Sequence, residues 1–288
     1  MKFVIAAAFQ PLDHLSPLAR AADECGFEAM AFSDHVVYPE KLDTPYPYTP
    51  DGSRRYDETS QFPDPWVTIG SLAAVTTRLR FTTNVFVLPM RNLFAAAKAI
   101  ATAAVLSNDR VTLTVGVGWS KIEFELMGQD FGARGRRTDE MLAVLPELWS
   151  GRMVEHQGRF YDFPRLCMNP VPRSPIPIWI GGISDAALRR AARHDGWLSD
   201  LQSSEEIVAC IAKARRFRGE IGRGSAPFDV MASASDAFSV DHYRRLGDAG
   251  VTHVLTMPWV LTSGLTADLV QKCDGIRRFA DDVIARLR

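Results

Sequence analysis

The turn formed by Gly181 and Gly182 carries the strongest chemical signal in the sequence. The apolar run 178–180 before it has the composition of a buried strand. Two glycines let the backbone turn sharply and approach a ligand, and Ser184 or Asp185 can cap the helix that follows. The unpaired N–H groups at a helix start bind anions. The segment therefore predicts a phosphate site, with an ordinary tight turn between strand and helix as the alternative.

The pair Asp34-His35 is a second chemical candidate, because it closes the apolar run 29–33. A histidine beside a carboxylate at a strand end can hold one tautomer. It can then hydrogen-bond a substrate oxygen or shuttle a proton. The alternative is a structural pair whose hydrogen bonds are satisfied within the core.

Strands and helices must position these groups, and the two alternate along the chain eight times. The predicted strands are 3–9, 29–33, 79–87, 111–117, 178–180, 197–200, 228–232 and 251–257. The predicted helices are 15–25, 65–77, 92–106, 137–148, 186–194, 204–221, 240–249 and 266–287. Eight such units in a chain of 288 residues predict one α/β domain over residues 1–288, a (β/α)₈ TIM barrel.

Such barrels place their functional groups at the carboxyl ends of the strands. The residues expected to face this mouth are Asp34, His35, Asn84, Gly116, Val117, Gly118, Trp119, Gly181, Gly182, Asp200 and 257–259.

Two further segments lie outside the barrel pattern. Residues 36–63 have no helical or strand period and are rich in proline and aromatic residues, so we predict a lid that shapes the substrate pocket and excludes water. A contact with a partner subunit is the alternative for its aromatics. Residues 152–163 predict a surface hairpin.

Composition excludes several function classes. With 33 basic and 34 acidic residues and 47% hydrophobic residues, the chain gives no reason to expect nucleic-acid or membrane binding. The apolar start of the chain is too short for a signal sequence and fits a first core strand. The four cysteines lack metal or redox spacing, which predicts reduced thiols in a cytoplasmic protein and no metal site.

The strand-end residues resemble those of the luciferase-like flavin and deazaflavin oxidoreductases, within them the branch that uses the deazaflavin F420. The resemblance covers essentially the whole chain. It is carried by five motifs in order, which are Phe32-Ser-Asp-His35, the loop with Pro45-Tyr-Pro-Tyr48 and Phe62-Pro-Asp-Pro65, Gly116-Val-Gly-Trp119, Arg134-Gly-Arg-Arg-Thr-Asp-Glu140 and Ile178-Trp-Ile-Gly-Gly182.

The resemblance implies a tricyclic ring in the barrel mouth, with its tail phosphate at the amides of Gly181 and Gly182 and at the following helix start. It implies a non-proline cis peptide at Asn84-Val85 that supports the ring, with a plain trans strand residue as the alternative. It also implies that His35 lies near the reactive ring. In the family pattern the aspartate, here Asp34, orients that histidine. The implied cofactor contacts are Asn84, Val85, Gly116, Val117, Gly118, Trp119, Gly181, Gly182, Ile183, Ser184 and Arg136.

Trp119 departs from the family pattern. In the sugar-phosphate and alcohol dehydrogenases of this family, the position after the glycine pair of strand four is an acid. An indole cannot exchange a proton. Either His35 serves alone, Glu123 or Glu125 substitutes, or the reaction needs no such group. We expect Trp119 to stack on the ring or the substrate, with core packing as the alternative.

The arginines Arg134, Arg136 and Arg137 lie at the start of the fourth predicted helix. They could bind a phosphate or a polyanionic cofactor tail through bidentate hydrogen bonds. They could equally form a solvated helix start, paired with Asp139 and Glu140. We favour the solvated face for two of them and a tail contact for Arg136.

The combined prediction is an oxidoreductase that moves a hydride between F420 and a small, largely apolar organic substrate. We expect a homodimer. FMN is the alternative cofactor, and it would imply a two-component monooxygenase that uses oxygen and a separate flavin reductase. Two other classes remain open, a barrel hydrolase using His35 and Asp34, and a cofactor-binding protein without catalysis.

Overall fold

The computed structural model describes residues 1–287. The predicted barrel is confirmed, because parallel strands follow one another in the order β3-β2-β1-β11-β10-β9-β8-β5-β4. The strands of this barrel are β1 (Lys2–Ala6), β2 (Ala29–Phe32), β3 (Arg80–Thr83), β4 (Phe86–Val87), β5 (Leu113–Gly116), β8 (Ile178–Gly181), β9 (Gly196–Gln202), β10 (Asp229–Ala234) and β11 (His253–Thr256).

One bent strand closes the barrel. The sequence predicted a single strand over 79–87, but only Asn84 and Val85 separate β3 from β4. The first half pairs with β2 and the second half pairs with β5. The two halves therefore serve as one of the eight strands of the barrel, and together they join the ends of the sheet.

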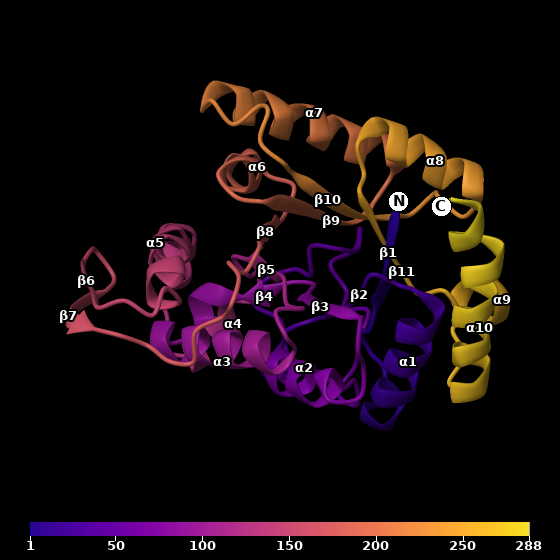
Figure 1. The fold of residues 1–288 in the computed structure, drawn as a ribbon, viewed down its shortest axis with the longest axis horizontal. Helices are drawn as coiled ribbons and strands as arrows, with labels where there is room; N and C mark the ends of the chain where they lie inside the picture. Colours follow the sequence, from indigo (N-terminus) through magenta and orange to yellow (C-terminus); the bar gives the residue numbers. More distant parts are fainter. Residues whose placement is uncertain (288) are drawn as a thin grey trace.

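The helices surround this barrel, with α7 and α8 on one side of the strands and α1, α2 and α3 on the opposite side (Figure 1). They are α1 (Leu12–Cys25), α2 (Pro65–Ala73), α3 (Leu93–Leu106), α4 (Lys121–Leu126), α5 (Arg134–Leu148), α6 (Asp185–Ala192), α7 (Ser204–Glu220), α8 (Val240–Ala249), α9 (Val260–Ser263) and α10 (Leu269–Asp282). None of the helices in residues 1–287 has both the length and the apolar character needed to cross a membrane.

The local signals at helix ends explain most of these boundaries. Gly26 and Gly250 end α1 and α8 in left-handed conformations, at φ 77° and 112°. At the start of α7, Ser203 forms a capping box with Glu206. The short helix α4 lies in a segment that the sequence predicted as a polar connection.

Apolar side chains fill both the barrel and the layer outside it. The inner cluster consists of Val4, Ala29, Ala31, Trp179, Leu198, Met231 and Leu255. A larger cluster joins the outer faces of the strands to the helices. Alternate residues of each strand thus face the two layers, as a closed barrel requires.

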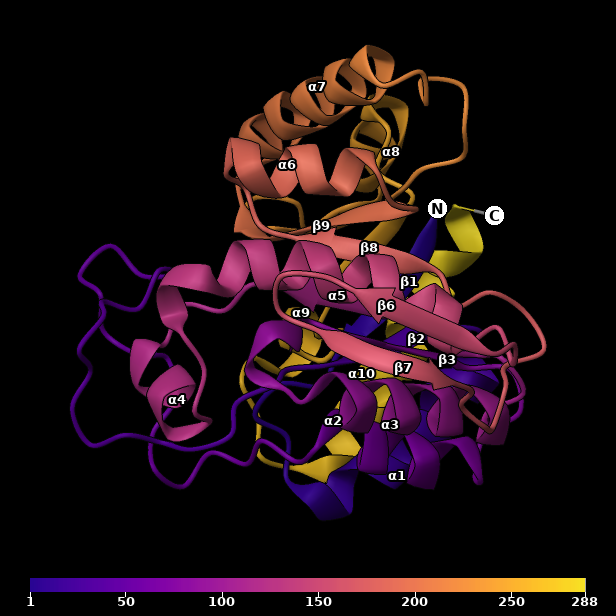
Figure 2. The ribbon, with the colours of Figure 1, turned by 90° about the vertical axis from the view of Figure 1, so that its left-hand side faces the viewer.

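Two excursions leave the barrel. The strands β6 (Val154–Gln157) and β7 (Asp162–Leu166) form an antiparallel hairpin in the region predicted for one. The 36–63 loop contains no helix or strand. In Figure 2 a long loop from the early part of the chain projects to the left of the barrel, on the same side as α4.

Asp23 ties the first helix to the start of β3. Its carboxylate accepts the amide hydrogens of Thr77 and Arg78, each at 2.8 Å, and that of Leu79. Burial alone would raise the pKa of Asp23, but these hydrogen bonds lower it below the ordinary value of 3.8.

We expect Asp23→Ala to lower the free energy of unfolding by about 2 kcal/mol at pH 7, because three amides lose a charged acceptor. A lowered folded-state pKa stabilises the protein above the unfolded value and is lost as the pH falls through the folded value. The difference between variant and parent, measured by urea unfolding, should therefore shrink below pH 4, near the ordinary value of 3.8. Glu24→Ala, an exposed neighbour, is the control; equal losses in both would contradict the role of Asp23.

Candidate functional site

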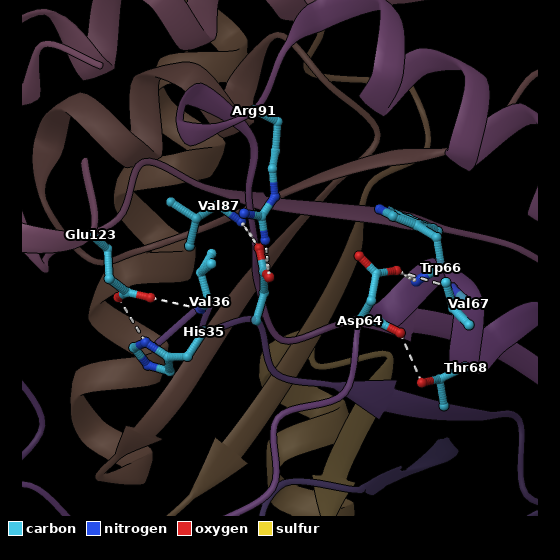
Figure 3. Close-up of polar contacts among 10 residues, drawn as sticks. His35, Val36, Asp64, Trp66, Val67, Thr68, Val87, Arg91 and Glu123 are labelled. Carbon is cyan, nitrogen blue, oxygen red and sulfur yellow. Dashed lines mark hydrogen bonds and ion pairs between the residues drawn. The ribbon is translucent and has the colours of Figure 1, made fainter. Parts of the chain in front are cut away.

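The central polar contact of the mouth joins His35 to Glu123. Nδ1 of His35 lies 2.9 Å from one carboxylate oxygen of Glu123, and the other oxygen accepts the amide hydrogen of Val36 at 2.7 Å (Figure 3). His35 follows β2, whereas Glu123 lies on α4 and is only 2% exposed. The loop that follows β2 and the short helix α4 together build this pair.

The charge state of Glu123 determines which ring nitrogen of His35 carries the hydrogen. Burial alone would raise the pKa of Glu123, but the hydrogen bond and charge of His35, with the amides of Val36 and Val37, lower it below the usual range. An ionised carboxylate only accepts hydrogen bonds, so Nδ1 of His35 is the donor. Nε2 is then the ring atom available to a substrate.

Asp34 has a different role from the one expected. Its carboxylate accepts the amide hydrogen of Val87 at 2.9 Å and forms an ion pair with Arg91. The expectation that Asp34 orients His35 is therefore wrong, since Glu123 is the partner of that ring. The Asp34 carboxylate fastens the end of β2 to the bent strand and to the segment after it.

Aromatic side chains cover His35. The ring centroids of Tyr56, Phe62 and Trp119 lie 5.1, 4.9 and 5.8 Å from that of His35. Tyr46 lies 5.2 Å from Trp119 in an edge-to-face arrangement, and both Tyr46 and Tyr56 are buried. The 36–63 loop thus packs its aromatics on the strand-end residues of the same chain, as a lid would.

Val85 forms the floor of the mouth. The Asn84-Val85 peptide bond is cis, as the resemblance implied. A Cβ placed on Gly116 would lie 2.3 Å from a methyl group of Val85, and one on Gly181 would lie 2.5 Å from the other methyl. These two glycines therefore make room for Val85, which is a different reason for their small size from the ligand approach that the sequence suggested.

Gly118 is small for a similar reason. Its φ is +81°, and a Cβ there would lie 2.5 Å from Val87 and 2.8 Å from Phe124. The neighbouring Val117 is half-buried. Gly118 therefore lets α4 approach β4, and so helps to place Glu123 beside His35.

The Gly182 turn differs in detail from the predicted phosphate site. The amide of Gly182 donates to the carbonyl of Leu198 at 3.3 Å, so it is already engaged. Ser184 caps α6 by accepting the amide hydrogen of Ala187 at 3.2 Å, as predicted. Within residues 1–287, no acceptor engages the amides of Ile183 and Ser184. Those two amides, rather than that of Gly182, are the ones that could reach a phosphate.

Two of the three arginines are structural rather than solvated. Arg134 donates to the carbonyl of Gly118 at 3.2 Å, and Arg137 donates to that of Arg91 at 3.1 Å. Arg136 is exposed and makes no side-chain hydrogen bond within the described chain. The acids expected as partners are used elsewhere, because Asp139 pairs with two arginines of and after α6, and Glu140 accepts amides of the hairpin.

Sequence reasoning missed Arg91 and left Glu123 as one of several alternatives. Nothing in their spacing marks them, because each finds its partner through the barrel closure rather than through a local pattern. Among residues 1–287, no cluster of three or more His, Cys, Asp and Glu side chains could hold a metal ion.

We expect Gly116→Ala to lower the free energy of unfolding by about 1 to 3 kcal/mol, because the new methyl group overlaps Val85. Gly219→Ala is the matched control. A Cβ at Gly219 meets nothing within 4 Å, and the change in a helix should stabilise by about 0.5 to 1 kcal/mol. Urea unfolding measures both. A Gly116→Ala protein as stable as the parent would show that the floor is not tightly packed.

A family model described as luciferase-like monooxygenase matches residues 2–242. An uncharacterized protein of Mycobacterium tuberculosis is 40% identical over 290 residues, which cover 100% of both chains. An F420-dependent glucose-6-phosphate dehydrogenase of Nakamurella multipartita is 27% identical over 240 residues, covering 81% of this chain and 66% of that protein.

Two solved structures share the fold. The F420-dependent tetrahydromethanopterin reductase of Methanopyrus kandleri has a TM-score of 0.77 at 16% identity, covering 100% of this chain and 99% of that one. The oxygenating constituent of 3,6-diketocamphane monooxygenase from Pseudomonas putida, in complex with FMN, has a TM-score of 0.64 at 17% identity, covering 85% and 70%. Since the family model matches most of its length, the chain belongs to the luciferase-like monooxygenase family, a family of oxidoreductases.

Proposed function

We propose that this protein is an oxidoreductase that binds F420 in the barrel mouth and transfers a hydride between its ring and a small organic substrate. The observation that carries the proposal is His35, fixed by Glu123 and covered by aromatic side chains at the carboxyl ends of the strands. The F420-dependent relatives support the choice of cofactor.

The residues of the mouth fit such a cofactor. Val85, between Gly116 and Gly181, offers an apolar floor for a flat ring. The unengaged amides of Ile183 and Ser184 at the start of α6 suit a phosphate.

Arg136 would be a contact for the charged tail of the cofactor. The carbonyl of Gly135 accepts a hydrogen bond from Arg190 of α6, so the start of α5 lies beside α6. The guanidinium of the next residue, Arg136, is exposed and would suit negative charge.

The protein would contribute position and electrostatics to the reaction. The bound cofactor would supply the chemistry of hydride transfer. Nε2 of His35 would hydrogen-bond the substrate oxygen, with Glu123 fixing the ring. Trp119, Tyr46 and Tyr56 would exclude water and leave space only for a small, largely apolar molecule. These aromatics pack on the site itself, so they must move for a ligand to enter.

FMN is the second candidate, because a structure of the same fold binds it. In that case the reaction would use oxygen and a separate flavin reductase. The homodimer and the cytoplasmic location stay predictions.

Titration of the apo protein with F420, followed by quenching of tryptophan fluorescence, should give a dissociation constant of about 1 to 10 μM, or −8 to −7 kcal/mol. Trp119 lies at the site and should report binding. FMN is titrated in parallel. Binding of FMN alone would replace the proposal by its alternative, and binding of neither would contradict the assignment of a flavin-type cofactor.

We expect His35→Ala and Glu123→Gln each to lower kcat/KM at least about 100-fold, because both disturb the hydrogen bond from Nε2 of His35 to the substrate oxygen. The dissociation constant of F420 should stay within about twofold of the parent value. Glu125→Gln is the control, since Glu125 is exposed on the same helix and pairs with Lys121 at 3.3 Å. Hydride transfer within twofold of the parent in His35→Ala would remove His35 from the mechanism.

A further inference from the structure

The acids at the mouth are unequally available. Both oxygens of Asp34 are engaged, one by the amide of Val87 and one by Arg91. Both oxygens of Glu123 are engaged, one by His35 and one by the amide of Val36. A reaction at a substrate oxygen needs a group that can take up or release a proton, and these two carboxylates are committed to protein partners.

Asp200 is a third acid, and the barrel geometry points it into the mouth. Leu198 belongs to the inner cluster of the barrel and lies level with Gly181, 3.5 Å from the position of a Cβ there. Residues two apart on a strand face the same side, so Asp200 also faces inward. It lies one layer nearer the mouth than Leu198 and the floor at Val85.

The backbone around Asp200 is irregular. Ser199 pairs with Ala232 and Gln202 pairs with Ala234, so three steps along β9 match two along β10. Leu201, inside this bulge, has φ 53°, which non-glycine residues rarely adopt. Bulges of this kind occur beside active sites, where they redirect a side chain.

The surroundings of Asp200 come from the lid and from the bent strand. The charged or titratable groups that face it are Arg55, Tyr46 and Tyr48, all of the 36–63 loop, and the amide of Asn84 faces it from the bent strand. Burial raises the pKa of Asp200, while Arg55 and Asn84 favour its charged form. The carboxyl group therefore lies half-buried beneath the lid, with the guanidinium of Arg55 near it.

We propose that Asp200 is a further catalytic residue of this mouth, the carboxyl group that exchanges a proton with the substrate oxygen while His35 holds that oxygen. The inference rests on the proposed function. For an alcohol, bound F420 would accept the hydrogen of the broken C–H bond together with its electron pair, as hydride. The O–H proton goes to the Asp200 carboxylate, and the carbonyl bond forms. The reverse reaction takes the same proton back.

Calorimetry of F420 binding in buffers of different ionisation enthalpy gives the number of protons exchanged as the site fills, without any substrate. We expect Asp200→Asn to change that number by roughly half a proton near the pH at which the group titrates. It should also lower kcat/KM for an alcohol substrate about 100-fold. Asp229→Asn is the matched control, because Asp229 lines a cavity at the opposite end of the barrel.

An unchanged proton count in Asp200→Asn would overturn the inference. So would a changed count with alcohol turnover within twofold of the parent. If F420 does not bind the parent at all, the proposed function fails separately. In that case the role of Asp200 is tested by NMR on the apo protein, through the carboxyl carbon resonance that is missing from the spectrum of Asp200→Asn. Titration of this resonance at or below the ordinary pKa of 3.8 would exclude an acid-base role for Asp200.

Discussion

The closure of the barrel by one bent strand is the constraint on which the mouth depends. The sheet joins its two ends only because β3 pairs with β2 and β4 pairs with β5. Between these halves the side chain of Val85 points inward, and a glycine on each of two neighbouring strands leaves room for it. The Asp34 carboxylate binds to the same stretch, through a hydrogen bond from the amide of Val87 and an ion pair with Arg91. Barrel closure, floor and strand end are therefore one packed unit.

The polar groups of the mouth are divided between stability and chemistry. Asp34 and Arg91 form an ion pair with each other, so the Asp34 carboxylate is bound by protein groups rather than by a ligand. The buried Glu123 binds Nδ1 of His35 and leaves Nε2 available to the mouth, so this carboxylate acts by orienting a neighbouring side chain. Near-identical side chains thus differ in role because their partners differ.

The barrel and the strand-end positions of the mouth could be predicted from the sequence, because both follow from local periodicity and from the glycine turns. The partner of His35 could not be predicted in this way. That partner lies on α4, a helix of only six residues, which the sequence did not predict. The adjacency of Asp34 and His35 in sequence suggested a pair, yet successive residues at a strand end point in different directions. The glycines were recognised as necessary, but only the fold tells which side chain occupies their space.

The hydrogen bond between His35 and Glu123 spans 88 residues and connects two excursions from the barrel, the loop after β2 and the helix after β5. Neither excursion is complete alone. Protein engineers who graft loops between relatives of this fold to change substrate range should therefore treat these two as a single cassette. Transplanting the loop after β2 together with His35, but without the matching α4, would give a histidine whose ring has no fixed orientation.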